Sequence, residues 1–578
     1  MTRDHRASRE AAATQADTVL RHGRVYTVDA GFRVAQAIAL RDGRVLAVGS
    51  DAEIDALIAP DTDVIELGGR AVLPGIDDSH LHGAAWGLGS PPYSLDLSYP
   101  NVRSIADIVD LVRRTAAERP AGEWIVGQGW DTGYLEECLA GERTLPDRTD
   151  LDAVAPEHPV CLSDFSGHMA CVNSAALRVA GVASETEAPA GGVIDRDAAG
   201  EATGILREGA QDLVQSVIPR ADHALRKRAI ADAVRRLNAR GITAFTEPGL
   251  GPGGEGILGG ALGGGAIRAY EELLDEGELT ARVSVLLLPL AMGESADGLR
   301  DRVRAQLAEH PVADPELLRI IGVKLFADGV PPNETSYMWQ PYGPSQGHGS
   351  LCVHGATEPL RETELRRAIS EVHELGLQAG VHVTGDHGID ITVDAFVEAN
   401  ERHPRDDARH YVIHGDFISD ERLAQLGERG YGVNMNPGIK AQITDLMDTV
   451  VGEELSARQW PTRSAADSGA TLCASSDAPV TQPDWLAGIA GMMSRKSKAT
   501  GRVSGPEQRI DFATALRAYT INAARQSFAE EWRGSLEPGK AADLVVLDTD
   551  SGSVDPDELT AINVDLTIFG GEVVFERL

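Results

Sequence analysis

The residues with the clearest capacity for chemistry are two histidines in the segment PGIDDSHLHG, residues 74–83. His80 and His82 stand two positions apart at the end of a predicted strand. Side chains of a strand alternate between its two faces, so both imidazoles are expected to point the same way. Neutral imidazoles are good ligands for zinc and similar cations. The pair indicates a metal site, although two polar residues on a rim would show the same spacing.

Further donors follow other apolar segments. His382 ends LQAGVHV, His414 ends YVIHG, and Asp477 follows TLCASS. The 32 positions from His382 to His414 are close to the length of one βα unit. At each position a satisfied polar residue of the core is the alternative. Donors of metal-ligand type at several strand ends favour one shared site instead.

Lys324 lies inside a very apolar segment, RIIGVKLFADG, residues 319–329. Burial of a lysine lowers its pKa, because the charged form loses its hydration. The neutral amine is a nucleophile that could take up carbon dioxide and form a carbamate, an anionic ligand able to bridge two metal ions. A structural lysine that reaches towards solvent and a Schiff-base lysine remain open as alternatives.

The elements that must position these residues follow a regular alternation. Apolar strands and amphipathic helices alternate between residues 71 and 529, which predicts a parallel sheet covered by helices. The candidate strands number eight, as a closed (β/α)8 TIM-like barrel requires, and barrel active sites gather at the carboxyl ends of the strands. The predicted strands are 71–79, 241–247, 281–289, 319–326, 377–383, 411–415, 431–436 and 471–476.

The segments outside the barrel predict an α/β chain of several parts. Residues 90–220 are too long for one βα unit, so we expect a subdomain inserted after the first barrel strand. Its strand-like segments 124–130 and 159–165 leave open a barrel register shifted by one strand. Residues 17–70 and 530–578 are rich in short strands and are expected to form one composite β-sandwich, because domain termini often lie close together. Residues 1–16 are expected to be a disordered leader.

Composition excludes several classes of partner. The chain carries 88 acidic and 53 basic residues, a formal net charge of −35, which argues against nucleic acid and anionic membranes. Five cysteines in 578 residues do not make a disulfide framework. The sequence contains neither a signal-peptide core nor an apolar segment long enough to span a bilayer. We therefore expect a cytoplasmic protein with a small-molecule substrate.

Taken together, the motifs resemble the metal-dependent amidohydrolase superfamily. The resemblance rests on H-x-H, Lys, His, His and Asp at successive strand ends, with the closing segment GSLEPGKAADLVVLD. Four further segments are similar to the branch called amidohydrolase family 3, which includes the YtcJ-like proteins and the N-substituted formamide deformylases. They are SGHMACVNSAAL (166–177), GGVIDRDAAGEATGILREGA (191–210), VKLFADG (323–329) and HVTGD (382–386).

The resemblance implies one or two divalent metal ions, with zinc favoured, and a possible homodimer. A metal-activated hydroxide would cleave a C–N bond of amide or N-formyl type, with Asp477 as general acid and base. A cyclic amide, an ester or a C–C bond is an alternative target, and a non-catalytic binding protein is disfavoured because every ligand position is filled. By position, His80, His82 and Asp477 would hold the more buried ion, His382 and His414 the second, and Lys324, N6-carboxylated, would bridge them.

The substrate pocket is predicted from less specific residues. His168, in SGHMA, is a candidate substrate or oxyanion contact, with a structural role as the alternative. The segment VPPNETSYMWQPYGPSQGHG, residues 330–349, departs from the branch pattern and is expected to form a lid or a pocket wall at the barrel mouth. Asn173 and Glu208 lie in motifs of the same branch but have no assigned chemistry. The aromatic candidates for the pocket are Trp86, Tyr337 and Trp339.

Overall fold

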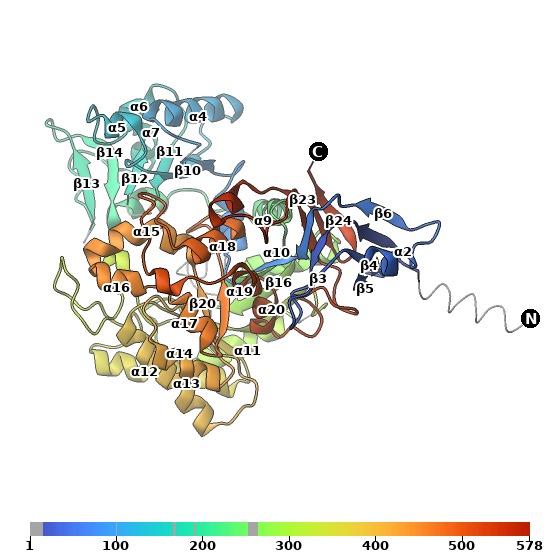
Figure 1. The fold of residues 1–578 in the computed structure, drawn as a ribbon. Helices are drawn as coiled ribbons and strands as arrows, with labels where there is room; N and C mark the ends of the chain where they lie inside the picture. The colour runs from blue at the N-terminus through green and yellow to red at the C-terminus, as the bar shows by residue number, and fades with distance from the viewer. Residues whose placement is uncertain are drawn as a thin grey trace, which may run out of the picture. The chain divides into compact units, whose positions relative to one another are not determined.

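The structure is a computed structural model that describes residues 15–99, 101–165, 169–189, 192–251, 264–311 and 313–577 (Figure 1). Contacts between residues divide the chain into two compact units. The first contains residues 1–85 and 230–578, and the second contains residues 86–229. His80 and His82 therefore belong to the same unit as the distant segments that carry the other predicted ligands.

The first unit is built on an eight-stranded parallel sheet that curves into a barrel. Strand follows strand in chain order, from the first to the last. Hydrogen bonds beyond their carboxyl ends join the two end strands, from the Asp477 amide to the His80 carbonyl (2.9 Å) and from the His82 amide to the Ala478 carbonyl (2.9 Å). The strands are β8 (Ile76–Asp78), β15 (Ile242–Leu250), β16 (Arg282–Leu287), β17 (Leu318–Phe326), β18 (Gln378–Val383), β19 (Tyr411–His414), β20 (Gly432–Met435) and β21 (Thr471–Ala474).

Helices alternate with these strands and surround the sheet (Figure 1). They present apolar residues to the strands, as Leu365, Ile369 and Val372 of α12 do, each below 1% exposed. The helices that follow β15 are α10 (Gly264–Asp275), α11 (Leu299–Glu309), α12 (Glu358–Glu374), α13 (Asp386–Arg402), α14 (Asp420–Glu428), α15 (Pro437–Val450), α16 (Glu453–Arg458), α17 (Thr462–Asp467), α18 (Trp485–Ser494), α19 (Phe512–Ala518) and α20 (Ile521–Gln526). The boundaries between the two units fall inside α3 (Gly83–Leu88) and α9 (His223–Asn238).

The predicted barrel is confirmed, and so is its register. Each of the eight predicted strands overlaps a barrel strand, whereas segments 124–130 and 159–165 belong to a separate sheet. The predicted strand 71–79 is divided at Gly75 into β7 (Ala71–Pro74), which pairs with sandwich strands, and β8. A side chain at Gly75 would meet the Thr243 hydroxyl at 2.1 Å, so this close approach requires glycine.

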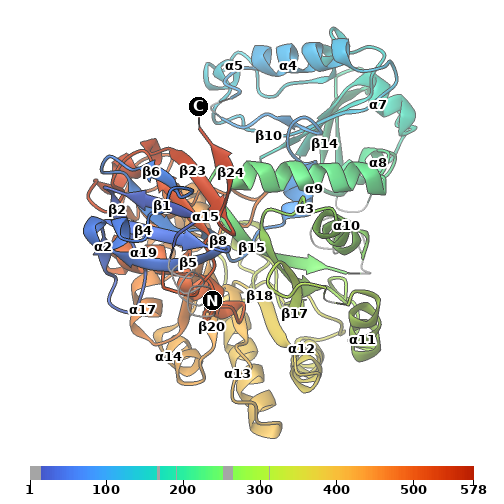
Figure 2. The ribbon, with the colours of Figure 1, turned by 90° about the vertical axis from the view of Figure 1, so that its right-hand side faces the viewer.

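Strands from both ends of the chain form the composite sandwich of the first unit (Figure 2). Its apolar core includes Leu20, Val72, Leu544 and Ile568, each 0% exposed. A short helix, α2 (Asp51–Asp55), packs beside it. One sheet is β5 (Arg44–Gly49), β4 (Ala37–Arg41), β1 (Thr18–Arg21) and β6 (Asp63–Glu66); the other is β24 (Glu572–Glu576), β23 (Val564–Phe569), β22 (Leu544–Leu547), β7, β2 (Arg24–Tyr26) and β3 (Val34–Ala35).

The second unit has a six-stranded mixed sheet of its own, packed against helices such as α4 (Ile105–Glu118). Asn173, left without chemistry by the sequence, is fully buried here: its Oδ1 accepts from the Val160 and Ala176 amides at 3.0 and 2.9 Å. This gives it a structural role. The sheet order is β13 (Val193–Arg196), β14 (Ala202–Arg207), β12 (Met169–Val172), β11 (Val160–Asp164), β10 (Ile125–Trp130) and β9 (Leu95–Asp96), and the other helices are α5 (Glu136–Leu139), α6 (Arg148–Asp152), α7 (Ser174–Val179) and α8 (Asp212–Gln215).

Most of the predicted leader, residues 1–14, falls outside the described residues. Ala16, which that prediction included, is 5% exposed and packs in an apolar cluster with Val19 and Ile54. Across the parts of the chain that are described, helices with the length and apolar character of a membrane span are absent.

Candidate metal centre

Three of the predicted ligands meet where the first and last barrel strands end. Asp477 Oδ1 lies 3.2 Å from His80 Nε2 and 3.4 Å from His82 Nε2. Donor atoms of these three side chains lie within 4.8 Å of one another, and all three residues are buried. Ligands about 2.1 Å from a tetrahedral ion stand about 3.4 Å apart, as simple geometry requires. The two measured separations match that spacing, so this donor set fits a zinc-sized cation.

The other two predicted histidines adjoin this group. The His382 and His414 ring centroids are 4.6 Å apart, and the His414 ring lies 5.4 Å from that of His80. His382 Nε2 lies 3.0 Å from the Gly329 carbonyl, which accepts its proton, so Nδ1 is left with a lone pair. His414 Nδ1 lies 2.7 Å from Asn436 Oδ1. Both rings therefore have one nitrogen engaged by the protein and the other free for a ligand.

Lys324 lies on the same face of β17 as Phe326, whose ring centroid is 5.3 Å from that of His382, and its charge acts on the pKa of both His80 and His382. It is 2% exposed, and its Nζ lies 4.9 Å from the Phe326 ring centroid. Burial lowers the pKa of Lys324 to about 7, against the opposing influence of Asp477. At neutral pH a large fraction of the side chain is therefore the neutral amine that carbamate formation requires.

Burial also sets the protonation of the imidazoles. It lowers the pKa of His80 to about 3 and that of His382 to about 4, with Lys324 as the next contribution in both cases. The pKa of His414 is lowered well below its usual value, again by burial first. For Asp477, burial acts to raise the pKa, but His80 and the hydrogen bonds to both imidazoles outweigh it and hold the pKa well below its usual range. The site thus combines the neutral imidazoles of His80, His382 and His414 with an ionised carboxylate, the protonation states that metal binding requires.

Two of the ligands have an unusual backbone. His414 and Asp477 have φ angles of 72° and 56°, a left-handed region that non-glycine residues rarely adopt. Such conformations are concentrated at functional sites, where the surroundings hold them in place. Their occurrence at two of the six predicted positions is independent support for a site here.

Two buried carboxylates that the sequence analysis did not select support the site. Glu247 Oε2 accepts from the Tyr270 hydroxyl (2.7 Å) and the Ala84 amide (3.0 Å), and so fixes the chain directly after His82. Asp328, 0% exposed, accepts from the Thr384 and Gly385 amides at 2.9 Å each, just beyond His382. Glu247 lies within the mostly apolar strand β15, and Asp328 stands two residues after the end of β17. An acidic residue in or just after such a strand is a signal that could have found both.

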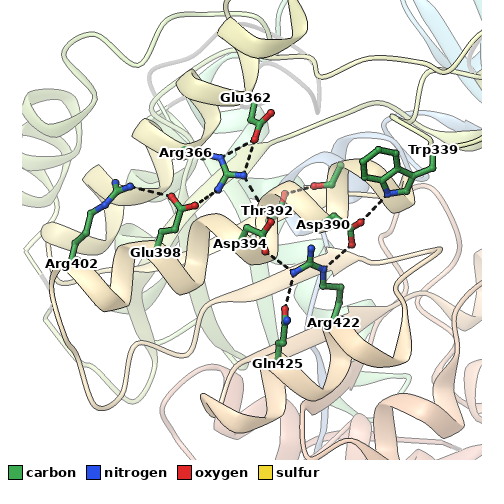
Figure 3. A network of polar contacts seen from close by, with 11 residues as sticks. Trp339, Glu362, Arg366, Asp390, Thr392, Asp394, Glu398, Arg402, Arg422 and Gln425 are labelled. Carbon is green, nitrogen blue, oxygen red and sulfur yellow. Dashed lines mark hydrogen bonds and ion pairs between the residues drawn. The ribbon is translucent and has the colours of Figure 1, made fainter.

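The segment 330–349, predicted as a lid or a wall, is attached to the barrel by several contacts. The Tyr337 amide donates to Asp328 Oδ2 (2.8 Å), and the Tyr337 and Trp339 rings stack on either side of His387, with centroids 4.2 and 3.5 Å away. The Trp339 indole donates to Asp390 (2.9 Å) at one end of a network of ion pairs on α13 and its neighbours (Figure 3). These contacts favour a wall. The network continues through Arg422, Asp394, Arg366, Glu362, Glu398 and Arg402.

The pocket residues named from the sequence remain predictions. Trp339 is 52% exposed, with its ring beside α13, whereas Tyr337 is partly buried. Trp86 belongs to the second unit and is 3% exposed. His168 lies outside the described residues, and of Glu208 only the backbone is described.

Comparison with known proteins gives consistent matches. The pattern of the Amidohydrolase family matches residues 63–575. The chain is 27% identical to YtcJ of Bacillus subtilis over 96% of this chain and 98% of that protein. It is 28% identical to the N-substituted formamide deformylase of Arthrobacter pascens, over 97% and 98%. A solved structure of an uncharacterised metal-dependent hydrolase from Pyrococcus furiosus superposes with a TM-score of 0.68 at 26% identity, covering 92% of this chain and 99% of that one.

Proposed function

Because this chain belongs to the amidohydrolase family, a family of metal-dependent hydrolases, we propose that it hydrolyses the C–N bond of an amide or N-formyl compound. The observation that carries the proposal is the convergence of His80, His82 and Asp477 at distances that fit one cation. The name of the Arthrobacter relative, N-substituted formamide deformylase, supports the bond type. Addition of water across this bond gives an amine and a carboxylic acid.

His80, His82 and Asp477 would hold one ion, and His382 with His414 a second. Nitrogen and carboxylate donors of this kind favour zinc among the common cations. A bound divalent cation supplies two effects, a lower pKa for a nearby water and polarisation of the scissile carbonyl. Lys324 as a carbamate would add an anionic oxygen between the two groups. Its nitrogen would attack carbon dioxide and lose a proton to solvent.

Asp477 is the proton carrier in this proposal. Its pKa lies well below the usual range, so the carboxylate is ionised and can accept the proton of the attacking water. The protonated carboxyl group of Asp477 then donates that proton to the leaving nitrogen, which departs as an amine. Burial of Asp477, at 8% exposure, keeps bulk water from competing for the proton.

The test is turnover by metal-loaded protein on a panel of N-formyl, N-acyl and cyclic amides, with esters included. We expect turnover of an amide or N-formyl member. Asp477→Asn removes the proton carrier and also an anionic metal ligand, so turnover is expressed per bound divalent ion, which plasma mass spectrometry measures. On that basis kcat should fall by about 10²- to 10⁴-fold, the usual size of a general acid–base contribution.

Asp301→Asn is the matched control, because Asp301 is 89% exposed on α11 and its variant should retain full turnover. Turnover of Asp477→Asn within tenfold of wild type would remove Asp477 as the proton carrier. Purified protein that holds no divalent metal after reconstitution would refute the proposed reaction class. Hydrolysis of esters alone would show that the bond cleaved is an ester C–O bond and not a C–N bond.

A further inference from the structure

Asn436 has an unexpected role for a residue at the start of a helix. It occupies the N-cap position of α15, where asparagine usually accepts a hydrogen bond from the first turn, but its side chain makes no such bond. The side chain is fully buried, and its Oδ1 lies 2.7 Å from His414 Nδ1. Asn436 therefore leaves the helix end uncapped and engages a predicted metal ligand instead.

The orientation of its amide is fixed by a chain of hydrogen bonds that starts at a backbone carbonyl. Asn434 Nδ2 lies 2.9 Å from the Ser79 carbonyl oxygen, which can only accept, so this atom must be the NH2 group. Asn434 Oδ1 then faces the Ser475 hydroxyl, which donates to it at 2.6 Å. The direction of each bond in the chain is thereby determined from its first member.

The same logic reaches His414. Ser475 has given its only proton to Asn434, so its oxygen accepts from Asn436 Nδ2 at 2.9 Å. Asn436 consequently presents Oδ1, an acceptor, to the imidazole. A neutral His414 must then carry its proton on Nδ1, which leaves the lone pair on Nε2. Since Ser79 directly precedes His80, one buried chain joins the backbone at one ligand to the protonation of another.

We propose that Asn436 is a positioning residue that holds His414 in the Nδ1–H form and so presents Nε2 to the metal. The inference rests on the proposed function for the statement that His414 binds a metal ion. The position of the His414 proton on Nδ1 follows from the hydrogen bonds alone. His382 shows the complementary arrangement, with Nε2 engaged and Nδ1 free. Partners of this kind typically change metal affinity by about 10- to 100-fold when removed.

The experiment compares Asn436→Leu, which removes the acceptor, with Asn436→Asp, which keeps one towards His414. Asn238→Leu is the matched control: Asn238 is 1% exposed and its side chain makes three hydrogen bonds, against two for Asn436, but none of the three is to a predicted ligand. Zinc affinity of the full chain is measured by competition with a chromophoric chelator. Nitrogen-15 NMR of histidine-labelled, chelator-treated protein identifies which nitrogen of His414 carries the proton.

We expect Asn436→Leu to lower the affinity of the site that contains His382 and His414 by about 10- to 100-fold, with wild-type affinity in Asn436→Asp and Asn238→Leu. Ser475→Ala, which removes one link and keeps Asn436, should give a smaller loss and covers the case in which Asn436→Leu does not fold. NMR should show Nδ1–H in the wild type. An Nε2–H signal there, or equal losses in Asn436→Leu and Asn238→Leu, would overturn the inference. Wild-type protein that binds no zinc would refute the proposed function instead, and the NMR result would still decide which form of His414 the chain imposes.

Discussion

A buried pair of imidazoles on the amino-terminal side of the barrel should make the protein sensitive to mild acid. His373 and His410 are both 0% exposed, with His373 Nδ1 and His410 Nε2 2.8 Å apart. The Ala379 amide donates to His410 Nδ1 (2.9 Å), and His373 Nε2 donates to the His403 carbonyl (2.6 Å). Each ring therefore accepts once and donates once, which only two neutral imidazoles can do.

The sign of the effect follows from the pKa shifts. Burial lowers the pKa of both residues, and for His410 it is lowered well below the usual value, with His373 and Arg405 acting in the same direction. In the unfolded chain both would have a pKa of about 6.5. Below that pH the unfolded state binds more protons than the folded state. The contribution of the pair to the free energy of unfolding is therefore fully present above about pH 6.5 and is lost as the pH falls. Each residue contributes a slope of about 1.4 kcal/mol per pH unit, and the pair contributes a slope of about 3 kcal/mol per pH unit.

The assay is urea unfolding followed by circular dichroism between pH 5 and 7.5. His410→Asn keeps an acceptor for the Ala379 amide and removes one titrating ring, so the fall in unfolding free energy below about pH 6.5 should become shallower by about 1.4 kcal/mol per pH unit. Tyr431→Phe is the matched control, because the Tyr431 ring lies 5.2 Å from that of His410 and does not titrate in this range. Equal slopes in wild type and His410→Asn would show that the pair is protonated in the folded state and refute this reasoning.

Two further predictions concern ion pairs away from the predicted ligands. Arg533 and Asp77 form a buried ion pair, with 5% and 2% of each residue exposed. Arg533→Met should therefore lower the free energy of unfolding by about 3–5 kcal/mol, and the double variant with Asp77→Asn should recover much of this loss. A loss below about 1 kcal/mol in Arg533→Met would contradict this interpretation. Arg422 bonds to Asp390, which holds the Trp339 indole, so Arg422→Ala should speed amide hydrogen exchange in residues 337–343 with a change in global stability within about 1 kcal/mol. Unchanged exchange there would mean that the wall does not depend on this network.

The barrel and its candidate ligands could be predicted because both depend on local patterns. The predicted histidine ligands and Asp477 end or follow apolar stretches, Lys324 lies inside one, and in a parallel barrel the carboxyl ends of all strands face the same side. The position of His414 at the end of YVIHG therefore fixed its place in the structure without knowledge of its neighbours. The division of 71–79 at Gly75 was not predictable in this way, since the close approach to Thr243 involves a strand far away in the chain.

The groups behind the ligands could not be predicted, because their partners come from distant segments. Asn434 and Asn436 stand two apart in the segment YGVNMN, but their roles depend on Ser79 and Ser475, residues that only the closure of the barrel brings together. Asp328 likewise accepts hydrogen bonds from a strand end more than fifty residues away. An isolated asparagine in a strand offers no signal of direction, and it is the direction of its hydrogen bonds that matters here.

The strained backbone at the site gives these supporting groups a clear energetic role. The left-handed conformations of His414 and Asp477 cost about 1–3 kcal/mol each, and such conformations persist only where the surroundings fix them. The Asp477 amide donates to the His80 carbonyl (2.9 Å), and the amide after His414 donates to the Val383 carbonyl (3.1 Å). Folding of the barrel supplies this energy through these hydrogen bonds and the packing around them. Residues that hold a ligand in place, such as Asn436 beside His414, should therefore influence metal affinity although they are not ligands themselves.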